Sequence, residues 1–100
     1  LVENLKSIID KKMSRKEGSG LISKLKRIYP DIQITETKTQ KEAFANVANE
    51  NNYFTIATLP VFAYYKKRYN LENLQIAGYT DMKFNLCIAV DKENIILLSI

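Results

Sequence analysis

The chain has 100 residues, of which 46% are hydrophobic and 26% charged, so it is long enough for one globular domain with an ordinary core. This composition excludes a disordered or low-complexity protein, and the longest strongly apolar run, 95–100, is too short to span a bilayer. The absence of histidine excludes Ser-His and Cys-His catalysis and most zinc sites. The single cysteine, Cys87, excludes an intrachain disulfide, and its apolar neighbours predict a buried core thiol.

The net charge of +4 raises the question of nucleic acid. Seven of the fifteen basic residues fall between Lys11 and Arg27, and three more stand together at 66–68. Several of these cations fall in the last turns of expected helices, where they complement the helix dipole. No RNA-binding aromatic pattern or zinc-finger spacing accompanies them, so we expect no nucleic-acid partner and keep a basic interaction module as an alternative.

The first half of the chain alternates strand and helix signals. Residues 1–10 show helical spacing or form a lead-in loop. Residues 11–16 are the weakest strand candidate, expected to be an edge strand or a degraded one. Ser19 is a good N-cap for a helix whose apolar face continues to Tyr29 and which Pro30 ends. Residues 31–37 alternate as a strand does.

The middle of the chain repeats this order. Thr39 and Glu42 form a capping box that opens a helix with Ala43, Phe44, Val47 and Ala48 on its apolar face. A strand at 53–57 follows and stops at Thr58, which can cap the next helix. Pro60 suits the first turn of that helix, which closes on the basic residues 66–68.

Two strands close the pattern, at 74–79 and 84–90, and 95–100 is expected to begin another helix. The apolar run 84–90 is typical of a central strand that is buried on both faces. This order predicts an α/β fold, a three-layer sandwich with a mostly parallel sheet of about five strands, one of them antiparallel, and helices on both faces. We expect 1–100 to be a single lobe. Because it begins at Leu1 without a Met and ends on apolar Ile100, we expect it to be a piece of a longer chain.

Two strand-to-helix corners could carry chemistry. Gly18-Ser19-Gly20 is a plausible anion cradle, because glycines permit close backbone approach and a helix N-terminus offers free N–H groups. The same residues would serve equally as a plain helix start. Thr58 is either a ligand contact at the carboxyl end of a strand or only a helix cap. No pair of carboxylates has a spacing that predicts acid-base chemistry or a metal, so we expect no enzyme and no cofactor.

Four segments give the chain a resemblance to the second lobe of the family 3 extracellular solute-binding proteins, above all to the versions that serve as periplasmic sensor domains of bacterial histidine kinases and cyclic-dinucleotide signalling proteins. These segments are 24–37, 41–47, 57–65 and 74–78, and the likeness extends over about 4–98. The resemblance implies a clamshell in which a solute lies between two α/β lobes, with this lobe inserted between the halves of the other. It further implies a ligand site at Gly18, Ser19, Gly20, Thr58 and Leu59, in which the Gly-Ser turn holds a ligand carboxylate.

Three positions depart from the family's pattern. Thr58 stands where an acidic residue or Asn often contacts the ligand amine, and a neutral hydroxyl cannot form a charge-assisted bond to ammonium. The segment 50–53 lacks the usual Gly and Asp, and the first strand is unusually polar. Either the ligand is not an ordinary α-amino acid or the site has become a structural or interaction surface.

The function that the resemblance implies is a non-catalytic, periplasmic or extracytoplasmic ligand sensor within a membrane-anchored protein. Its partners would be a small polar solute, amino acid-like or a carboxylate, a second lobe, and a kinase or cyclase module. An alternative is the substrate-binding component of an ABC importer, with a permease as partner. Dehydratase-like enzymes built on the same fold are disfavoured, because neither Tyr53 nor Thr58 supplies an acid.

Overall fold

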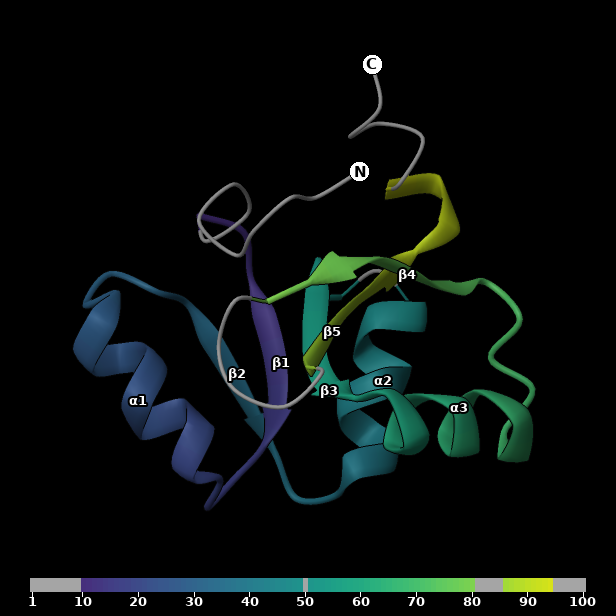
Figure 1. Ribbon diagram of the computed structural model, residues 1–100, viewed down its shortest axis with the longest axis horizontal. Coiled ribbons are helices and arrows are strands. Elements are labelled where there is room, and N and C mark those ends of the chain that lie inside the picture. The colour runs from purple at the N-terminus through teal and green to yellow at the C-terminus, as the bar shows by residue number, and fades with distance from the viewer. Residues whose placement is uncertain (1–9, 50, 81–85, 95–100) are drawn as a thin grey trace.

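The computed structural model describes residues 10–49, 51–80 and 86–94. The three strand-helix units and the final pair of strands follow in the order that the sequence predicts (Figure 1). The elements are β1 (Met13–Lys16), α1 (Gly20–Ile28), β2 (Ile34–Thr37), α2 (Gln40–Ala48), β3 (Phe54–Thr58), α3 (Leu59–Arg68), β4 (Leu74–Tyr79) and β5 (Leu86–Asp91). The expected helices at 1–10 and 95–100 lie outside the described residues, apart from Asp10.

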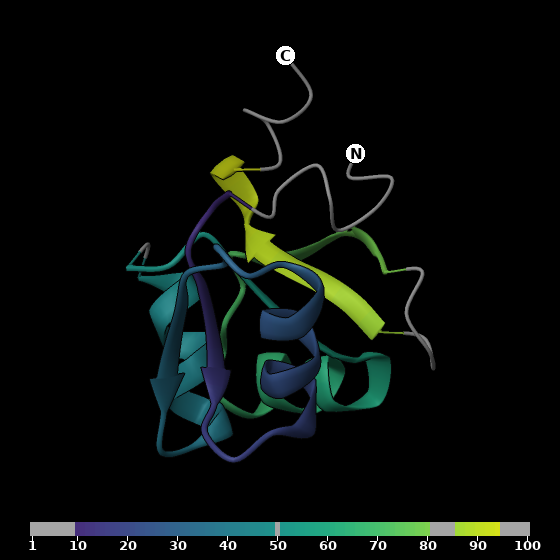
Figure 2. The same cartoon turned by 90° about the vertical axis from the view of Figure 1, so that its left-hand side faces the viewer.

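The strands form one five-stranded sheet in the order β2-β1-β3-β5-β4. β1 pairs in parallel with β2 and β3, whereas β5 pairs antiparallel with β3 and β4. The sheet is therefore mixed, and the protein has a mixed α/β fold, as predicted. In Figure 1 α1 lies to the left of the sheet and α2 and α3 to the right, and Figure 2 shows the same arrangement from the α1 side.

Strand β1 is not the sheet edge that its polar sequence predicts, because it lies between β2 and β3. Two of its polar side chains, Ser14 and Arg15, form hydrogen bonds within the fold, whereas Lys16 is exposed. The Ser14 hydroxyl, fully buried, donates to the Ala43 carbonyl, and the Ser14 carbonyl accepts from the Thr55 hydroxyl. Hydrogen bonds of this kind remove the cost of burying a polar strand, and a sequence pattern does not reveal them.

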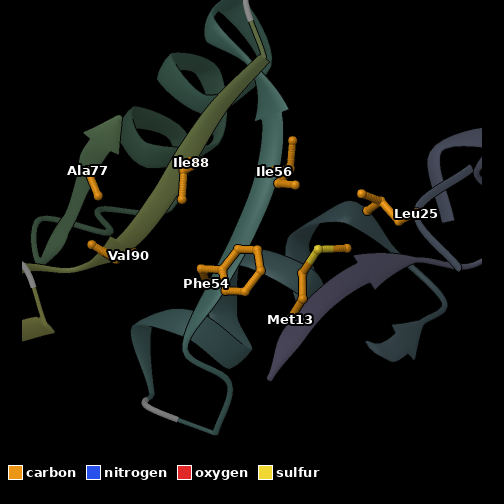
Figure 3. Packing of buried hydrophobic residues seen from close by; sticks show 7 residues of the cluster. All are labelled: Met13, Leu25, Phe54, Ile56, Ala77, Ile88 and Val90. Atoms are coloured by element: carbon orange, nitrogen blue, oxygen red, sulfur yellow. The ribbon is translucent and has the colours of Figure 1, made fainter. Parts of the chain in front are cut away.

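The core consists of two clusters that share β3 and β5. The first joins Leu25 of α1 to Met13, Phe54, Ile56, Ala77, Ile88 and Val90, and Figure 3 shows Leu25 facing Met13 and Ile56. The second joins Phe44 and Val47 of α2 and Phe62 of α3 to Ala57, Leu74, Cys87 and Ala89. Successive residues of β3 and β5 thus enter different clusters, as the alternation of a strand requires.

Strand β5 is paired on both sides and residues 87–91 are buried, so its predicted central position is confirmed. Cys87 is buried, as expected, and burial raises the pKa of its thiol. The helical spacing of the sequence also puts Ile28 on the apolar face of α1, and this part of the prediction is wrong, because Ile28 is 47% exposed. Among the helices of the described residues, none has the length and apolarity to cross a membrane.

Candidate functional site

The candidate site lies where β1 and β3 separate. Their register contains one pair, Met13 with Phe54, after which the backbones no longer pair. From β1 the chain continues to β2, which lies on one side of β1 in the sheet, whereas β3 lies on the other side of β1. The order of the strands in the sheet therefore reverses at this point. In open α/β sheets the crevice at the carboxyl ends of such strands is where ligands bind.

Arg15 bridges this gap. Its Nη1 donates to the Ile56 carbonyl of β3, and its Nε donates to Ser19 Oγ at 3.3 Å. The guanidinium thus replaces the backbone pairing that β1 and β3 lack beyond their first residues. Because a guanidinium carries five N–H donors, these two bonds leave three N–H groups for other acceptors.

The Gly18-Ser19-Gly20 turn opens α1 as predicted. Ser19 is the N-cap, and its Oγ accepts from the Leu21 N–H at 3.2 Å as well as from Arg15. Both lone pairs of this oxygen are then engaged, while its own O–H can still donate. The turn is a helix start, and it also presents a donor beside Arg15.

The two glycines of the turn differ in what they require. Gly18 has φ +75°, a left-handed conformation that disfavours other residues, whereas a Cβ at Gly20 would meet open space. We expect Gly18→Ala to lower the free energy of unfolding by about 1–2 kcal/mol. Gly20→Ala, its matched control, should leave the value unchanged or raise it slightly. Urea denaturation of both variants measures the difference, and equal losses would contradict the assigned geometry.

Thr58 occupies the N-cap position of α3, but its side chain makes no capping hydrogen bond. The expectation that Thr58 caps the helix through its hydroxyl is therefore wrong. Pro60 in the first turn already lacks an N–H, which reduces the number of donors that a cap would satisfy. The Thr58 hydroxyl remains able to serve a ligand.

A hollow of about 260 Å³ lies at this edge of the sheet. It is lined by Arg15, Lys16, Gln40, Ala57, Thr58, Val61 and Tyr65. Thr58 thus shares the hollow with Arg15, and Arg15 connects it to Ser19. Gly18, Ser19, Gly20 and Leu59 are not among the residues that line it, and Leu59 is 40% exposed at the start of α3.

The electrostatics of the hollow are positive. Arg15 makes no ion pair within the described part of the chain, and burial lowers the pKa of its guanidinium from the ordinary value. A lowered pKa is what a cation shows when burial removes part of its hydration and no carboxylate replaces that hydration. Residues 10–49, 51–80 and 86–94 contain no cluster of three or more His, Cys, Asp or Glu that could hold a metal ion.

A larger hollow, about 580 Å³, lies at the opposite edge and joins Asp10, Lys11 and Lys12 to Glu93 and Asn94. It contains side chains of both charges and gathers the two ends of the described chain. The smaller hollow is the better candidate, because it lies at the reversal of strand order and its charged lining residues, Arg15 and Lys16, are both cations.

Sequence reasoning missed Arg15, Lys16 and Gln40. One feature of the sequence could have identified Arg15, namely that it is a charged residue in a strand that ends just before a glycine turn. We interpreted that charge only as the mark of a weak strand. Gln40 comes close to Thr58 only because α2 begins at the same edge at which β3 ends, and pattern analysis does not place these two elements together.

The chain matches no known protein family and no curated protein when it is compared with both.

Proposed function

We propose that this chain is one lobe of a solute-binding sensor domain and that it holds a small polar solute at the carboxyl ends of β1 and β3. The observation that carries this proposal is the gathering of Arg15, Ser19 and Thr58 where those strands separate. Each of the three has a donor that the described part of the chain leaves available. Open donors beside a hollow at a reversal of strand order favour a ligand site over a merely structural corner.

The proposal includes the finer architecture, a mostly parallel sheet between two helical layers. Support comes from the parallel pairing of β1 with β2 and β3, with β5 antiparallel to both of its neighbours. The division of the core, with α1 in one cluster and α2 and α3 in the other, supports it as well.

Insertion of this lobe into a second one is supported by the positions of Asp10 and Asn94. Asp10 precedes β1 and Asn94 follows β5, yet both line the hollow at the edge opposite the candidate site. Two adjacent connections on that side would act as a hinge and leave the carboxyl edge free to close on a partner lobe.

The mechanism is closure of the clamshell on its solute. Ser19 and Thr58 would donate to the solute from this lobe while the partner lobe covers its other side. The solute stabilises the closed state by the difference between its affinities for the closed and open states. The sensor domain would lie outside the cytoplasm, and its closure would pass to the kinase or cyclase module of the same membrane-anchored protein.

The test is thermal unfolding of the full-length protein with a panel of amino acids, carboxylates and neutral polar solutes. A solute at a hundred times its dissociation constant should add about 2.7 kcal/mol of stability. Thr58→Val should remove that gain without changing the stability of the ligand-free protein, because the Thr58 hydroxyl makes no cap bond. Thr39→Val is the control, since it removes a hydroxyl that accepts from the Glu42 N–H at 3.1 Å and should lower stability with or without solute. The proposal is rejected if no solute changes the unfolding temperature.

A further inference from the structure

We propose that the hollow between β1 and β3 selects an organic anion, the carboxylate of a small organic acid without a cationic amine, and that Arg15 is the residue that sets this specificity. The inference rests on the proposed solute-binding function and names the class of solute. It is carried by the chemistry of the side chains that line the hollow.

The hollow has two charged lining residues, Arg15 and Lys16, which offer only donors, and its other polar lining residues, Gln40, Thr58 and Tyr65, can donate as well as accept. Arg15 has three N–H groups beyond its bonds to Ile56 and Ser19, and Lys16 contributes an ammonium group. Thr58 can donate its O–H, because it does not use its hydroxyl as a cap. Ser19 does not line the hollow, but it contacts Arg15 and can donate its own O–H there, since its oxygen already accepts two bonds. A ligand that satisfies these groups must be rich in acceptors, and a carboxylate offers about four lone-pair positions on two oxygens.

No residue that lines the hollow within the described part of the chain is acidic. The cationic amine of an amino acid would therefore lie near Arg15 and Lys16 without a carboxylate from the lining residues to pair with. Both the unpaired ammonium and its repulsion from the two cations would oppose binding. The lining thus discriminates by charge and not only by shape.

Arg15 is better suited than Lys16 to set this preference. Its guanidinium is partly withdrawn from water, forms no ion pair within the described residues, and is held by Ile56 and Ser19. An anion would replace the hydration that burial has removed, and the fixed planar donors match a carboxylate in a two-bond arrangement. Lys16 is exposed, so water screens its charge.

The test compares three four-carbon probes of similar shape, namely succinate, succinamide and 1,4-diaminobutane, on the full-length protein at constant ionic strength. The signals of the Arg15 Nε–H and the Thr58 amide are followed by NMR during each titration. We expect succinate to shift both signals at a concentration at least tenfold lower than succinamide does, and the diamine to leave them unchanged. This comparison needs no variant, so loss of folding cannot obscure it.

Matched variants then separate the role of Arg15 in binding from its structural role. Arg15→Gln should abolish the preference for succinate over succinamide, and Arg15→Lys should retain part of it. Arg27→Gln removes the same charge from an exposed position on α1 and should leave the preference intact. If Arg15→Gln proves unfolded, Arg15→Lys tests the assignment by itself: the Thr58 signal should show a reduced preference for succinate, and an unchanged preference would overturn the role of Arg15.

The outcomes distinguish this inference from the proposed function. Equal binding of succinate and succinamide overturns anion selection but leaves a solute site. A preference that survives Arg15→Gln overturns the assignment of Arg15. If none of the three probes shifts the signals, anion selection at this hollow is wrong, and if in addition no solute of the thermal panel stabilises the protein, the proposed function fails with it.

Discussion

Phe44→Ala should lower the free energy of unfolding by about 3–5 kcal/mol, a large part of the about 5–15 kcal/mol that stabilises a typical domain. Phe44 is fully buried on α2, and its ring centroid lies 6.2 Å from that of Phe62 and 5.5 Å from that of Tyr65. Truncation removes this burial and leaves a cavity between α2 and α3. Chemical denaturation followed by far-UV circular dichroism measures the loss.

The control for this prediction is Tyr79→Ala. Tyr79 is 49% exposed at the end of β4, so removal of its ring should change the unfolding free energy by less than about 1 kcal/mol. A similar loss in both variants would contradict the placement of Phe44 at the centre of the second cluster. A folded Phe44→Ala protein should also bind solute more weakly, because Tyr65 lines the hollow and stacks on Phe44.

Asn73→Ala should lower the free energy of unfolding by about 2–4 kcal/mol, since it removes one bond to a carboxylate and one to a carbonyl. The Asn73 amide donates to Asp91 Oδ2 at 2.6 Å and to the Ala48 carbonyl at 2.8 Å. It therefore joins the end of α2 to the start of β4 and the end of β5. Asp91 is only 5% exposed, so its carboxylate would lose a partner that water cannot easily replace.

Two further variants test this assignment. Asn51→Ala removes the same side chain from an exposed position and should cost less than about 0.5 kcal/mol. The double variant Asn73→Ala/Asp91→Ala should cost less than the sum of the two single losses, because each single change leaves the other partner unsatisfied. Strict additivity in urea denaturation would show that the two side chains do not interact.

The local elements were predictable because their signals are local. Ser19 caps α1, the Thr39 hydroxyl accepts from the Glu42 N–H, and Pro60 stands in the first turn of α3, as their sequence positions indicate. Capping and the conformational preferences of proline depend on residues within one helical turn. The order of the strands and helices, and with it the mixed α/β fold, follows from those signals.

The position of β1 was not predictable from its own residues. Its polar sequence indicates an edge strand, yet Ser14 is satisfied by Ala43 and Thr55, which lie 29 and 41 residues away in the chain. Whether a buried polar group costs stability depends on such distant partners. Of the two roles expected of Thr58, the hydroxyl cap is wrong, since a suitable residue at an N-cap position need not use its hydroxyl there.

The sequence by itself determined which residues form each described helix and most strands and that Cys87 lies in a central strand, and it offered two corners as candidates for a ligand contact. Only the tertiary structure decided that β1 is internal, that β1 and β3 separate after one pair, and that Arg15 fills the gap between Ser19 and Ile56. The physical reason is the range of the interactions. Capping and periodicity act within a few residues, whereas the lining of the hollow at the reversal of strand order comes from β1, α2, β3 and α3, which only the folded sheet brings together.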